Sequence, residues 1–292
     1  MKPAKFDYIL AESVDQVVDA LDKGGGETIV LAGGQTLMPM LAMRLARPAV
    51  VVDINKVAEL PGIAVAGDEL VIKPCPRQAE ALASTLVQRR LPLLAKAIAF
   101  VGHQQTRNRG TVGGSLSHAD PASEIPLAAL ALDASVSLRS VTGTRRVLLK
   151  DYFLGPMMTA RADNEVLLAV HFPLNSGPIG TGFHEVSERR GDFAVVAAAA
   201  VIGLDGAGIC DAATLAIGGA HGTPRRIGAL EDRLRGRKID AGAIRSALPV
   251  IADALQPGGD QHADAAYRLR VANVLAERAL LDALAEAVAS MI

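Results

Sequence analysis

The chain is poor in metal ligands and in aromatic side chains. Its 292 residues include two cysteines, Cys75 and Cys210, together with three tyrosines, six phenylalanines and no tryptophan. An iron–sulfur cluster normally takes four cysteine ligands, so this chain is not expected to hold one by itself. It also lacks a Cys-x-x-Cys pair, a His-Glu-x-x-His motif and a nucleophile elbow. We therefore predict no metal site and no catalytic side chain of its own.

Charge of one sign and long apolar runs are also missing. The net charge is −1, and the basic residues at Arg225–Arg226 and Arg233–Lys238 have acidic neighbours, so we expect a solvated face and no nucleic-acid partner. The apolar run from Phe193 to Leu204 is shorter than the roughly twenty residues of a transmembrane helix and predicts a buried strand. The first residues lack the apolar core of a secretory signal. We expect a cytoplasmic protein without a transmembrane segment.

Two glycine-rich loops stand out, Ala32–Thr36 and Gly110–Ser115, and neither contains a lysine. Glycine lets backbone N–H groups approach phosphate oxygens closely, and the threonine and serine hydroxyls add further donors. The lysine of a P-loop and the spacing of the Gly-x-Gly-x-x-Gly fingerprint are both absent. The pair of loops thus indicates two halves of a diphosphate cradle without phosphoryl transfer. The alternative interpretation is that each loop is an ordinary turn after a strand.

The first third of the chain predicts a small β-α-β unit followed by a second block. A capping box at Ser13–Gln16 opens a helix that continues to about Asp22, and a strand at Thr28–Leu31 precedes the first loop. A short helix is expected to reach Leu45, before a strand at Val50–Asp53. The elements expected next are a hairpin at 63–65 and 70–73, helices at 78–88 and 92–100, and strands at 136–139, 145–149 and 166–172.

The run Pro173–Pro178 is rich in turn formers and predicts a domain boundary. Beyond it we expect strands at 183–187, 194–204 and 212–218 and helices at 241–255 and 263–289. In the last helix, large apolar residues recur at steps of three and four, which predicts a buried face. A contact with a partner subunit is the alternative for this stripe, which comprises Tyr267, Val271, Val274, Leu275, Leu281, Leu284 and Val288.

Three long motifs carry a family resemblance: Leu31–Leu45, Arg107–Ser115 and Ala119–Pro126. They closely resemble the FAD-binding medium subunit of molybdenum hydroxylases, as in carbon monoxide dehydrogenase and xanthine dehydrogenase. The resemblance covers nearly the whole chain. It implies an α+β fold with a two-part PCMH-type (vanillyl-alcohol-oxidase-like) FAD-binding domain at 1–175, with subdomains at about 1–57 and 58–175. A smaller α+β domain of the carbon monoxide dehydrogenase flavoprotein type is implied at 178–290.

The resemblance also implies the residues that contact FAD. The two loops would hold the diphosphate and the ribityl chain, Glu124 would bond the nucleotide, and Asp120 is a nearby alternative. Both acids also suit local roles, Glu124 at a helix start and Asp120 in a turn. The cofactor-binding residues expected in full are Ala32, Gly33, Gly34, Gln35, Thr36, Leu37, Val101, Thr111, Gly113, Gly114, Ser115, Asp120, Glu124, Leu167, Leu168 and Phe193.

Aromatic and aliphatic side chains are implied around the two ring systems of FAD. Gly191-Asp192-Phe193 resembles a Gly-Asp-Tyr segment that brings a ring to the isoalloxazine, and phenylalanine lacks the phenolic hydroxyl. Phe193 also suits the start of a buried strand. Val101 stands where relatives place an aromatic residue against adenine, with Leu167 or Leu168 as the second wall. Core packing is the alternative for these leucines.

The implied function is electron transfer. FAD would pass electrons from a small iron–sulfur subunit with 2Fe–2S clusters to an external acceptor, while substrate is oxidised on a large subunit that carries a molybdenum–molybdopterin cofactor. A dimer of heterotrimers is the implied assembly. Two alternatives stay open at this point: a free-standing flavin oxidoreductase, and a nonenzymatic nucleotide-binding scaffold. Neither the substrate nor the acceptor can be read from this chain.

Overall fold

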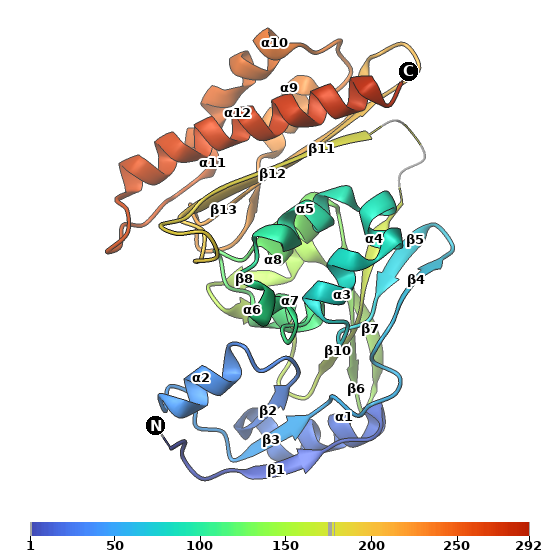
Figure 1. The fold of residues 1–292 in the computed structure, drawn as a ribbon, viewed down its shortest axis with the longest axis vertical. Helices are drawn as coiled ribbons and strands as arrows, with labels where there is room; N and C mark the ends of the chain where they lie inside the picture. The colour runs from blue at the N-terminus through green and yellow to red at the C-terminus, as the bar shows by residue number, and fades with distance from the viewer. Residues whose placement is uncertain (1, 175–176, 178, 292) are drawn as a thin grey trace.

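The computed structural model describes residues 2–174, 177 and 179–291. Residues 175, 176 and 178 of the expected domain boundary lie outside the described residues. The chain forms three stacked blocks, each with its own sheet (Figure 1). None of the helices in the described ranges combines the length and the apolar character needed to cross a membrane.

The N-terminal block is a small parallel sheet with the strand order β1-β3-β2. The predicted helix and the two strands are confirmed, and the Ser13 hydroxyl accepts from the Gln16 N–H at 3.2 Å to start α1. The first strand was not predicted, because its four side chains are all exposed and give no alternating pattern. The elements are β1 (Asp7–Leu10), α1 (Val14–Gly24), β2 (Thr28–Leu31), α2 (Leu37–Ala42) and β3 (Val50–Asp53).

Helix α2 ends at Ala42, three residues before the predicted Leu45. Arg44 adopts a left-handed conformation with φ 59°, which stops the helix before Pro48 can. The prediction was wrong because the left-handed residue here is an arginine, which has no special preference for that conformation.

The second block is an antiparallel sheet of order β4-β5-β10-β6-β7 covered by short helices. The predicted helix at 78–88 is wrong in one respect, since Ser84 has extended backbone and caps a separate helix through its hydroxyl. The second glycine loop was also expected as a loop throughout, yet Val112–His118 is helical and Thr111 is its N-cap. The helices are α3 (Gln78–Ala83), α4 (Thr85–Arg90), α5 (Pro92–Phe100), α6 (Gln104–Arg107), α7 (Val112–His118) and α8 (Glu124–Ala131).

The strands of the second block agree closely with the prediction and add one short hairpin. Its β8 and β9 lie beside the main sheet, and they were missed because they span only three and two residues. The strands are β4 (Ile63–Ala66), β5 (Glu69–Ile72), β6 (Ser135–Ser140), β7 (Gly143–Leu148), β8 (Phe153–Gly155), β9 (Met158–Thr159) and β10 (Val166–Pro173).

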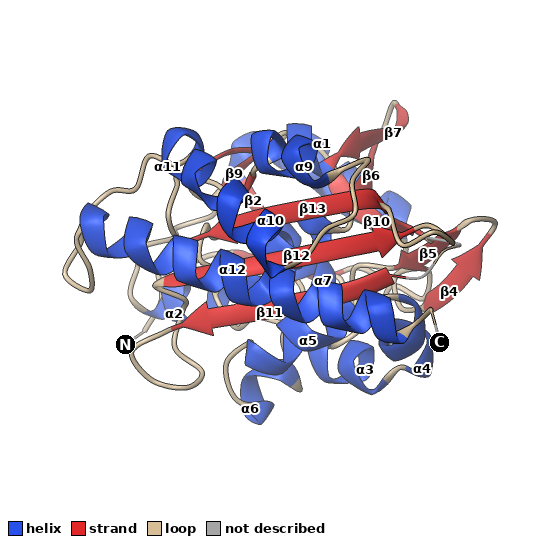
Figure 2. Cartoon of the chain, turned by 90° about the horizontal axis from the view of Figure 1, so that it is seen from above, coloured by secondary structure: helices blue, strands red, loops and turns tan. Residues whose placement is uncertain are grey.

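The C-terminal block is an antiparallel sheet of order β11-β12-β13-β14 with helices on both faces (Figure 2). Every residue of β12 is buried, and its side chains alternate between the core of the second block and the core beneath α12. The elements are β11 (Ile179–Val186), β12 (Val196–Leu204), β13 (Cys210–Gly218), β14 (Arg225–Arg226), α9 (Gly228–Leu234), α10 (Ala241–Ala247), α11 (Ile251–Ala254) and α12 (Ala265–Ala289).

The long helix α12 packs on this sheet through small residues, which corrects the predicted stripe of large ones. Of that stripe only Leu275 is fully buried, whereas Tyr267, Val274 and Val288 are exposed. The buried face of α12 consists mainly of alanines. Strand β11 has glycine opposite this face, because a Cβ at Gly182 would lie 2.0 Å from the carbonyl oxygen of Ala279. Close packing of small residues therefore decides which side of α12 faces the sheet.

Candidate cofactor-binding site

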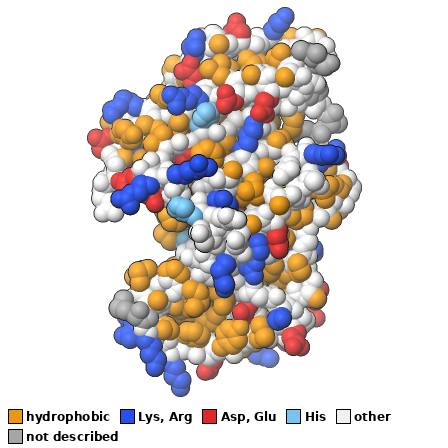
Figure 3. All heavy atoms as spheres, in the orientation of Figure 1, with side chains coloured by type: hydrophobic (Ala, Val, Ile, Leu, Met, Phe, Trp, Pro, Cys, Tyr) orange, Lys and Arg blue, Asp and Glu red, His pale blue; other side chains and the backbone are white. Residues whose placement is uncertain are grey.

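A cavity of about 520 Å³ lies where the three blocks meet, and both glycine-rich loops line it. This volume is in the usual range of small-molecule and cofactor sites. Figure 3 shows the molecule hollowed on one side between the lowest block and the rest of the chain. Of the sixteen expected contacts, all but Leu168 line the cavity: Ala32, Gly33, Gly34, Gln35, Thr36, Leu37, Val101, Thr111, Gly113, Gly114, Ser115, Asp120, Glu124, Leu167 and Phe193.

The first loop presents a row of free backbone donors. In the part of the chain that the structure describes, the N–H groups from Gly33 to Leu37 donate to no carbonyl or side chain. Gly34 has φ 70°, the left-handed conformation that turns successive N–H groups toward one side. Successive N–H groups of this kind form an anion-binding concavity. The first loop is thus built to bind a negatively charged group without a cationic side chain.

The second loop differs from the first, because most of its backbone N–H groups, including those of both glycines in the helix α7, are already paired within the protein. The Gly113 N–H donates to the Pro74 carbonyl at 3.1 Å, and the Gly114 N–H donates to the Thr111 hydroxyl at 3.0 Å. A Cβ at Gly113 would lie 2.5 Å from the Pro74 Cα, so glycine is needed there for packing. This loop supplies a close-packed wall and the Ser115 hydroxyl, which is 2.9 Å from the Ser123 hydroxyl. The expectation that both loops offer free N–H groups was wrong for Gly113 and Gly114, whereas the Thr111 N–H donates to no group in the described residues.

The two loops touch each other directly. A Cβ on Gly33 would lie 2.4 Å from the carbonyl oxygen of Arg109 and 2.8 Å from the Cα of Gly110. Only glycine allows this approach between the N-terminal block and the second block. The cavity walls on the two sides are therefore fixed relative to each other at this contact.

Arg77 ties the same two loops together through side chains. Its Nη1 donates to the Arg109 carbonyl and its Nη2 to the Asn55 Oδ1, each at 2.7 Å. The Asn55 amide in turn donates to the Ala32 carbonyl at 2.9 Å. Asp53 and Tyr8 extend this chain across the N-terminal sheet. No motif in the sequence indicates this role of Arg77, because its partners, the Arg109 carbonyl and the Asn55 side chain, are brought together only by the fold.

Gln78 is a second lining residue that the sequence did not indicate. It is buried, and its Oε1 atom has no hydrogen-bond partner in the described part of the chain. A buried acceptor of this kind costs free energy unless a ligand or water donates to it. Arg161 and Glu165 also line the cavity, and Arg145 holds the Glu165 carboxylate with two hydrogen bonds at 2.6 and 2.8 Å.

Glu124 is a buried carboxyl at the start of α8, with only 4% of its surface exposed. Burial, reinforced by the nearby Asp120 carboxylate, raises its pKa to about 7. Burial and the proximity of Glu124 likewise raise the pKa of Glu185 on β11 to about 8. The Asp120 side chain lines the cavity. Its carboxylate also accepts a hydrogen bond from the Ala122 N–H at 2.8 Å, so Asp120 stabilises the local turn as well.

The apolar walls come from Val101, which directly follows α5, and from Leu167 on β10; both line the cavity. Leu168 packs instead against the core of the N-terminal block, on the same face of β10 as Val166, because successive side chains of a strand point to opposite faces. Phe193 lies at the cavity mouth, 65% exposed and three residues ahead of β12. It therefore does not begin the buried strand.

These features fit FAD. A row of free N–H groups suits a diphosphate, Gln78 Oε1 and Glu124 are buried acceptors for ligand hydroxyl groups, and Val101 and Leu167 form an apolar slot. Within the described residues, no three His, Cys, Asp or Glu side chains converge as a metal site would require.

Comparison with known families agrees with this fit. Residues 4–175 match the FAD-binding domain in molybdopterin dehydrogenase, and residues 181–283 match the carbon monoxide dehydrogenase flavoprotein C-terminal domain. The chain belongs to the FAD-binding subunits of the molybdenum hydroxylases. The recognition, the fold class and the cofactor predicted from the sequence are confirmed.

Relatives match along the whole chain. The alpha subunit of the 6-hydroxypseudooxynicotine dehydrogenase complex of Paenarthrobacter nicotinovorans is 36% identical and covers 97% of this chain and 96% of its own. The carbon monoxide dehydrogenase medium chain of Hydrogenophaga pseudoflava is 32% identical over 96% of this chain and 97% of its own. Among solved structures, quinoline 2-oxidoreductase from Pseudomonas putida 86 has a TM-score of 0.92 at 33% identity, covering 98% of this chain and 99% of that one.

We predict that Arg77→Met weakens FAD binding about tenfold, because two hydrogen bonds that fix the contact between the loops are lost. Fluorescence titration of the chain with FAD measures this change. Arg77→Lys keeps the positive charge but lacks the forked guanidinium that donates to two partners at once. Its FAD affinity should therefore lie between those of Arg77→Met and wild type. The exposed Arg237→Met is the matched control. Equal affinity in Arg77→Met and wild type would show that the tie does not position the loops.

We also predict a pH-dependent effect of Glu124→Gln on the stability of the chain without ligand. The folded-state pKa of Glu124 lies above its ordinary value of 4.5, at about 7, so the folded state holds this proton more tightly than the unfolded state. Folding stability therefore falls as pH rises from about 4.5 to 7. Glutamine stays neutral, so the variant should melt above wild type at pH 8 and show a smaller gain or none at pH 5.

Thermal melts at the two pH values measure this difference. The control Glu59→Gln changes an exposed carboxylate and should have little effect at either pH. A gain for Glu124→Gln that is the same at pH 5 and pH 8 would contradict the raised pKa.

Proposed function

We propose that this chain binds FAD in the cavity between the two glycine-rich loops and acts as the electron-transfer subunit of a molybdenum hydroxylase. The observation that carries the proposal is the row of unpaired N–H groups from Gly33 to Leu37, opening into a cavity whose apolar slot and buried acceptors fit the rest of FAD. The family supports the same role, since its named members are subunits of dehydrogenases and hydroxylases.

The residues of the cavity divide by what they would hold. The first loop would bind the diphosphate, while Gln78, Ser115 and Glu124 would bond ligand hydroxyl groups. Val101 and Leu167 would enclose the adenine, and Phe193 would cover the isoalloxazine at the mouth. Bound FAD would supply the redox chemistry, and the chain would bind it, orient it and limit the access of water. No side chain is assigned as a catalytic acid or base.

Electrons must reach and leave this chain through partners or acceptors. The described residues form no metal site, and the sequence contains too few cysteines for a cluster. Multi-subunit complexes are the form in which the relatives occur, as in the 6-hydroxypseudooxynicotine dehydrogenase complex. We propose a heterotrimer with an iron–sulfur subunit and a molybdenum-cofactor subunit, paired as a dimer of heterotrimers in the cytoplasm. Within the chain, we propose the division into domains 1–175 and 178–290.

The cradle is tested by comparing two glycines with the same backbone conformation. Gly34 at φ 70° belongs to the first loop, whereas Gly67 at φ 63° lies in the hairpin turn between β4 and β5. Gly34→Ala should weaken FAD binding about tenfold, because strain of about 1–2 kcal/mol at a left-handed position reorients the free N–H groups. Gly67→Ala should lose similar stability and keep its FAD affinity. Equal losses of FAD affinity in the two variants would contradict a specific role for the first loop.

The assembly is tested by expression with the genes adjacent to this one. We expect the tagged chain to bring down an iron–sulfur protein and a molybdenum-cofactor protein in equal amounts, measured by mass spectrometry and metal analysis. A chain that purifies alone with FAD and oxidises a substrate unaided would contradict the subunit role and favour the free-standing oxidoreductase.

A further inference from the structure

Four arginines lie within two residues of cavity-lining positions, and none of them has a carboxylate partner in the part of the chain that the structure describes. They are Arg107 and Arg109, which follow the cavity-lining residues Val101 and Gly102, and Arg189 and Arg190, which precede the cavity-lining Gly191. None of the four forms an ion pair within residues 2–174, 177 and 179–291. We call these four residues the basic rim.

Close contacts place the two segments of the basic rim against each other. The Arg107 Nη1 donates to the carbonyls of Val101 and Gly102 at 2.8 and 3.0 Å, so its charge stays close to the cavity wall. A Cβ on Gly191 would lie 2.6 Å from the His103 ring, so the 187–193 loop rests on the segment that leads to Arg107. Lys and Arg side chains are visible above the hollow in Figure 3.

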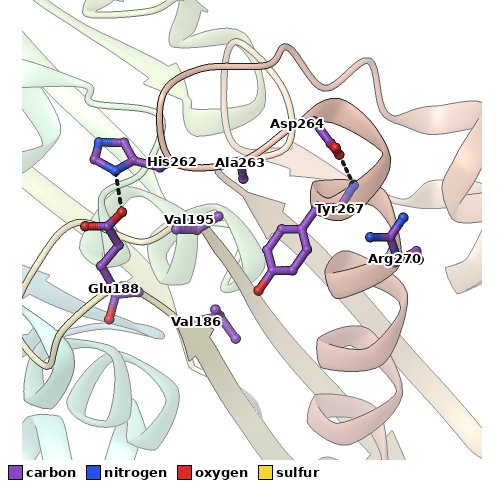
Figure 4. Close-up of a pocket in the computed structure, with 9 residues that line it drawn as sticks. Val186, Glu188, Val195, His262, Ala263, Asp264, Tyr267 and Arg270 are labelled. Carbon is purple, nitrogen blue, oxygen red and sulfur yellow. Dashed lines mark hydrogen bonds and ion pairs between the residues drawn. The ribbon is translucent and has the colours of Figure 1, made fainter.

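The nearest acidic residue of the loop is already engaged elsewhere. Glu188 points away toward His262, and their side chains lie 2.8 Å apart (Figure 4). The pair faces a smaller pocket at the start of α12, next to Tyr267 and Arg270. Glu188 thus forms its ion pair with His262 and none with Arg189 or Arg190 within the described residues, and both arginines are exposed. Asp192 is the other acid of the loop, and it lines the cavity.

We propose that the basic rim binds a small anionic electron acceptor, an oxidant that carries carboxylate or phosphate groups, at the mouth of the FAD cavity. The proposal rests on the proposed function, because it assumes that FAD lies behind the mouth. Arginine forks match carboxylate and phosphate groups, and a positive rim around a recess raises the rate of encounter with anions. The exposed Phe193 beside the rim offers an apolar surface to a planar oxidant.

The position of the arginines favours a small molecule over a protein partner. They come from two separate segments that border one opening, whereas a protein surface would meet a broad face. The basic run Arg233–Lys238 serves as the internal comparison. Arg233 and Arg237 are exposed and form no ion pair among the residues that the structure describes, and no residue of their segment lines either pocket. The basic rim and the pair Arg233 and Arg237 share their positive charge, but only the basic rim lies next to cavity-lining residues.

Binding is measured first with hexacyanocobaltate, a redox-inert trianion, by isothermal titration of the full chain with and without FAD. We expect the double variant Arg189→Gln/Arg190→Gln to weaken binding about tenfold, and Arg109→Gln to weaken it less. The control Arg233→Gln/Arg237→Gln should bind as wild type does. Equal binding in the rim variant and the control variant would overturn the proposal, whatever the state of FAD.

Electron transfer is measured second, by mixing the FAD-loaded, dithionite-reduced chain with an acceptor and following the return of the oxidised flavin absorbance. Two ferricyanide ions each take one electron, so that reduced FAD loses two electrons and releases its protons to water. We expect flavin reoxidation by ferricyanide to be about tenfold slower in the rim variant, Arg189→Gln/Arg190→Gln, than in wild type. The rate with hexaammineruthenium(III), a trication, should be unchanged or higher. Added salt should reduce the difference in ferricyanide rate between wild type and the rim variant, because it screens the charges.

Two outcomes separate this inference from the proposed function. Loss of FAD from wild type would defeat the proposed function, and the hexacyanocobaltate titration would still report on the basic rim. Full FAD content with equal slowing of both acceptors in the rim variant would overturn the inference alone, because a charge-selective site cannot slow an anion and a cation alike.

Discussion

The contact between the two glycine-rich loops is the constraint on which the rest of the site depends. Gly33 meets the Arg109 carbonyl and the Gly110 Cα so closely that no side chain fits between them. Arg77 and Asn55 bond the carbonyls on either side of this contact, so the loops are held by backbone groups as well as by packing. The N–H groups from Gly33 to Leu37 take no part in these bonds or in any other within the described residues, and the loop that carries them lines the cavity. The close contact at Gly33 thus holds the first loop, with its free N–H groups, against the second block, where the loop can bind an anion.

The third block secures the opposite side of the cavity. Strand β12 sends alternate side chains into two cores, so the C-terminal sheet is fixed to the second block through its own face. Lys96 on α5 reinforces the link by bonding the Thr181 carbonyl and the Glu286 carboxylate of α12. The loop that carries Phe193 connects β11 to β12 and is therefore anchored at both ends by buried strands. The C-terminal sheet thus holds this exposed loop at the cavity mouth.

Much of the fold was readable from the sequence, and the errors have physical causes. The strands at Thr28–Leu31, Val50–Asp53 and Val166–Pro173 follow apolar runs bounded by turn formers. The residues expected in the site were implied by the family resemblance of three motifs. The face of α12 was misjudged because periodicity counts large apolar residues, whereas the sheet accepts only alanine beside Gly182. Arg77 and Gln78 were missed because their roles depend on partners distant in sequence. Likewise, the paired N–H groups of Gly113 and Gly114 depend on Pro74 and on a cap, and composition cannot show either.

Burial of Glu124 links the chemistry of the cavity to its choice of ligand. With a pKa of about 7, this carboxyl is poised between its neutral and charged forms near physiological pH. A ligand hydroxyl that donates to it stabilises the charged form and lowers the pKa, so binding releases a proton. An apolar ligand gives no such bond. It leaves without a donor both the buried carboxyl and the Gln78 Oε1, which has no hydrogen-bond partner among the described residues. The groups that cost the chain stability when no ligand is bound are therefore the ones that favour a hydroxyl-bearing nucleotide over other molecules of similar size.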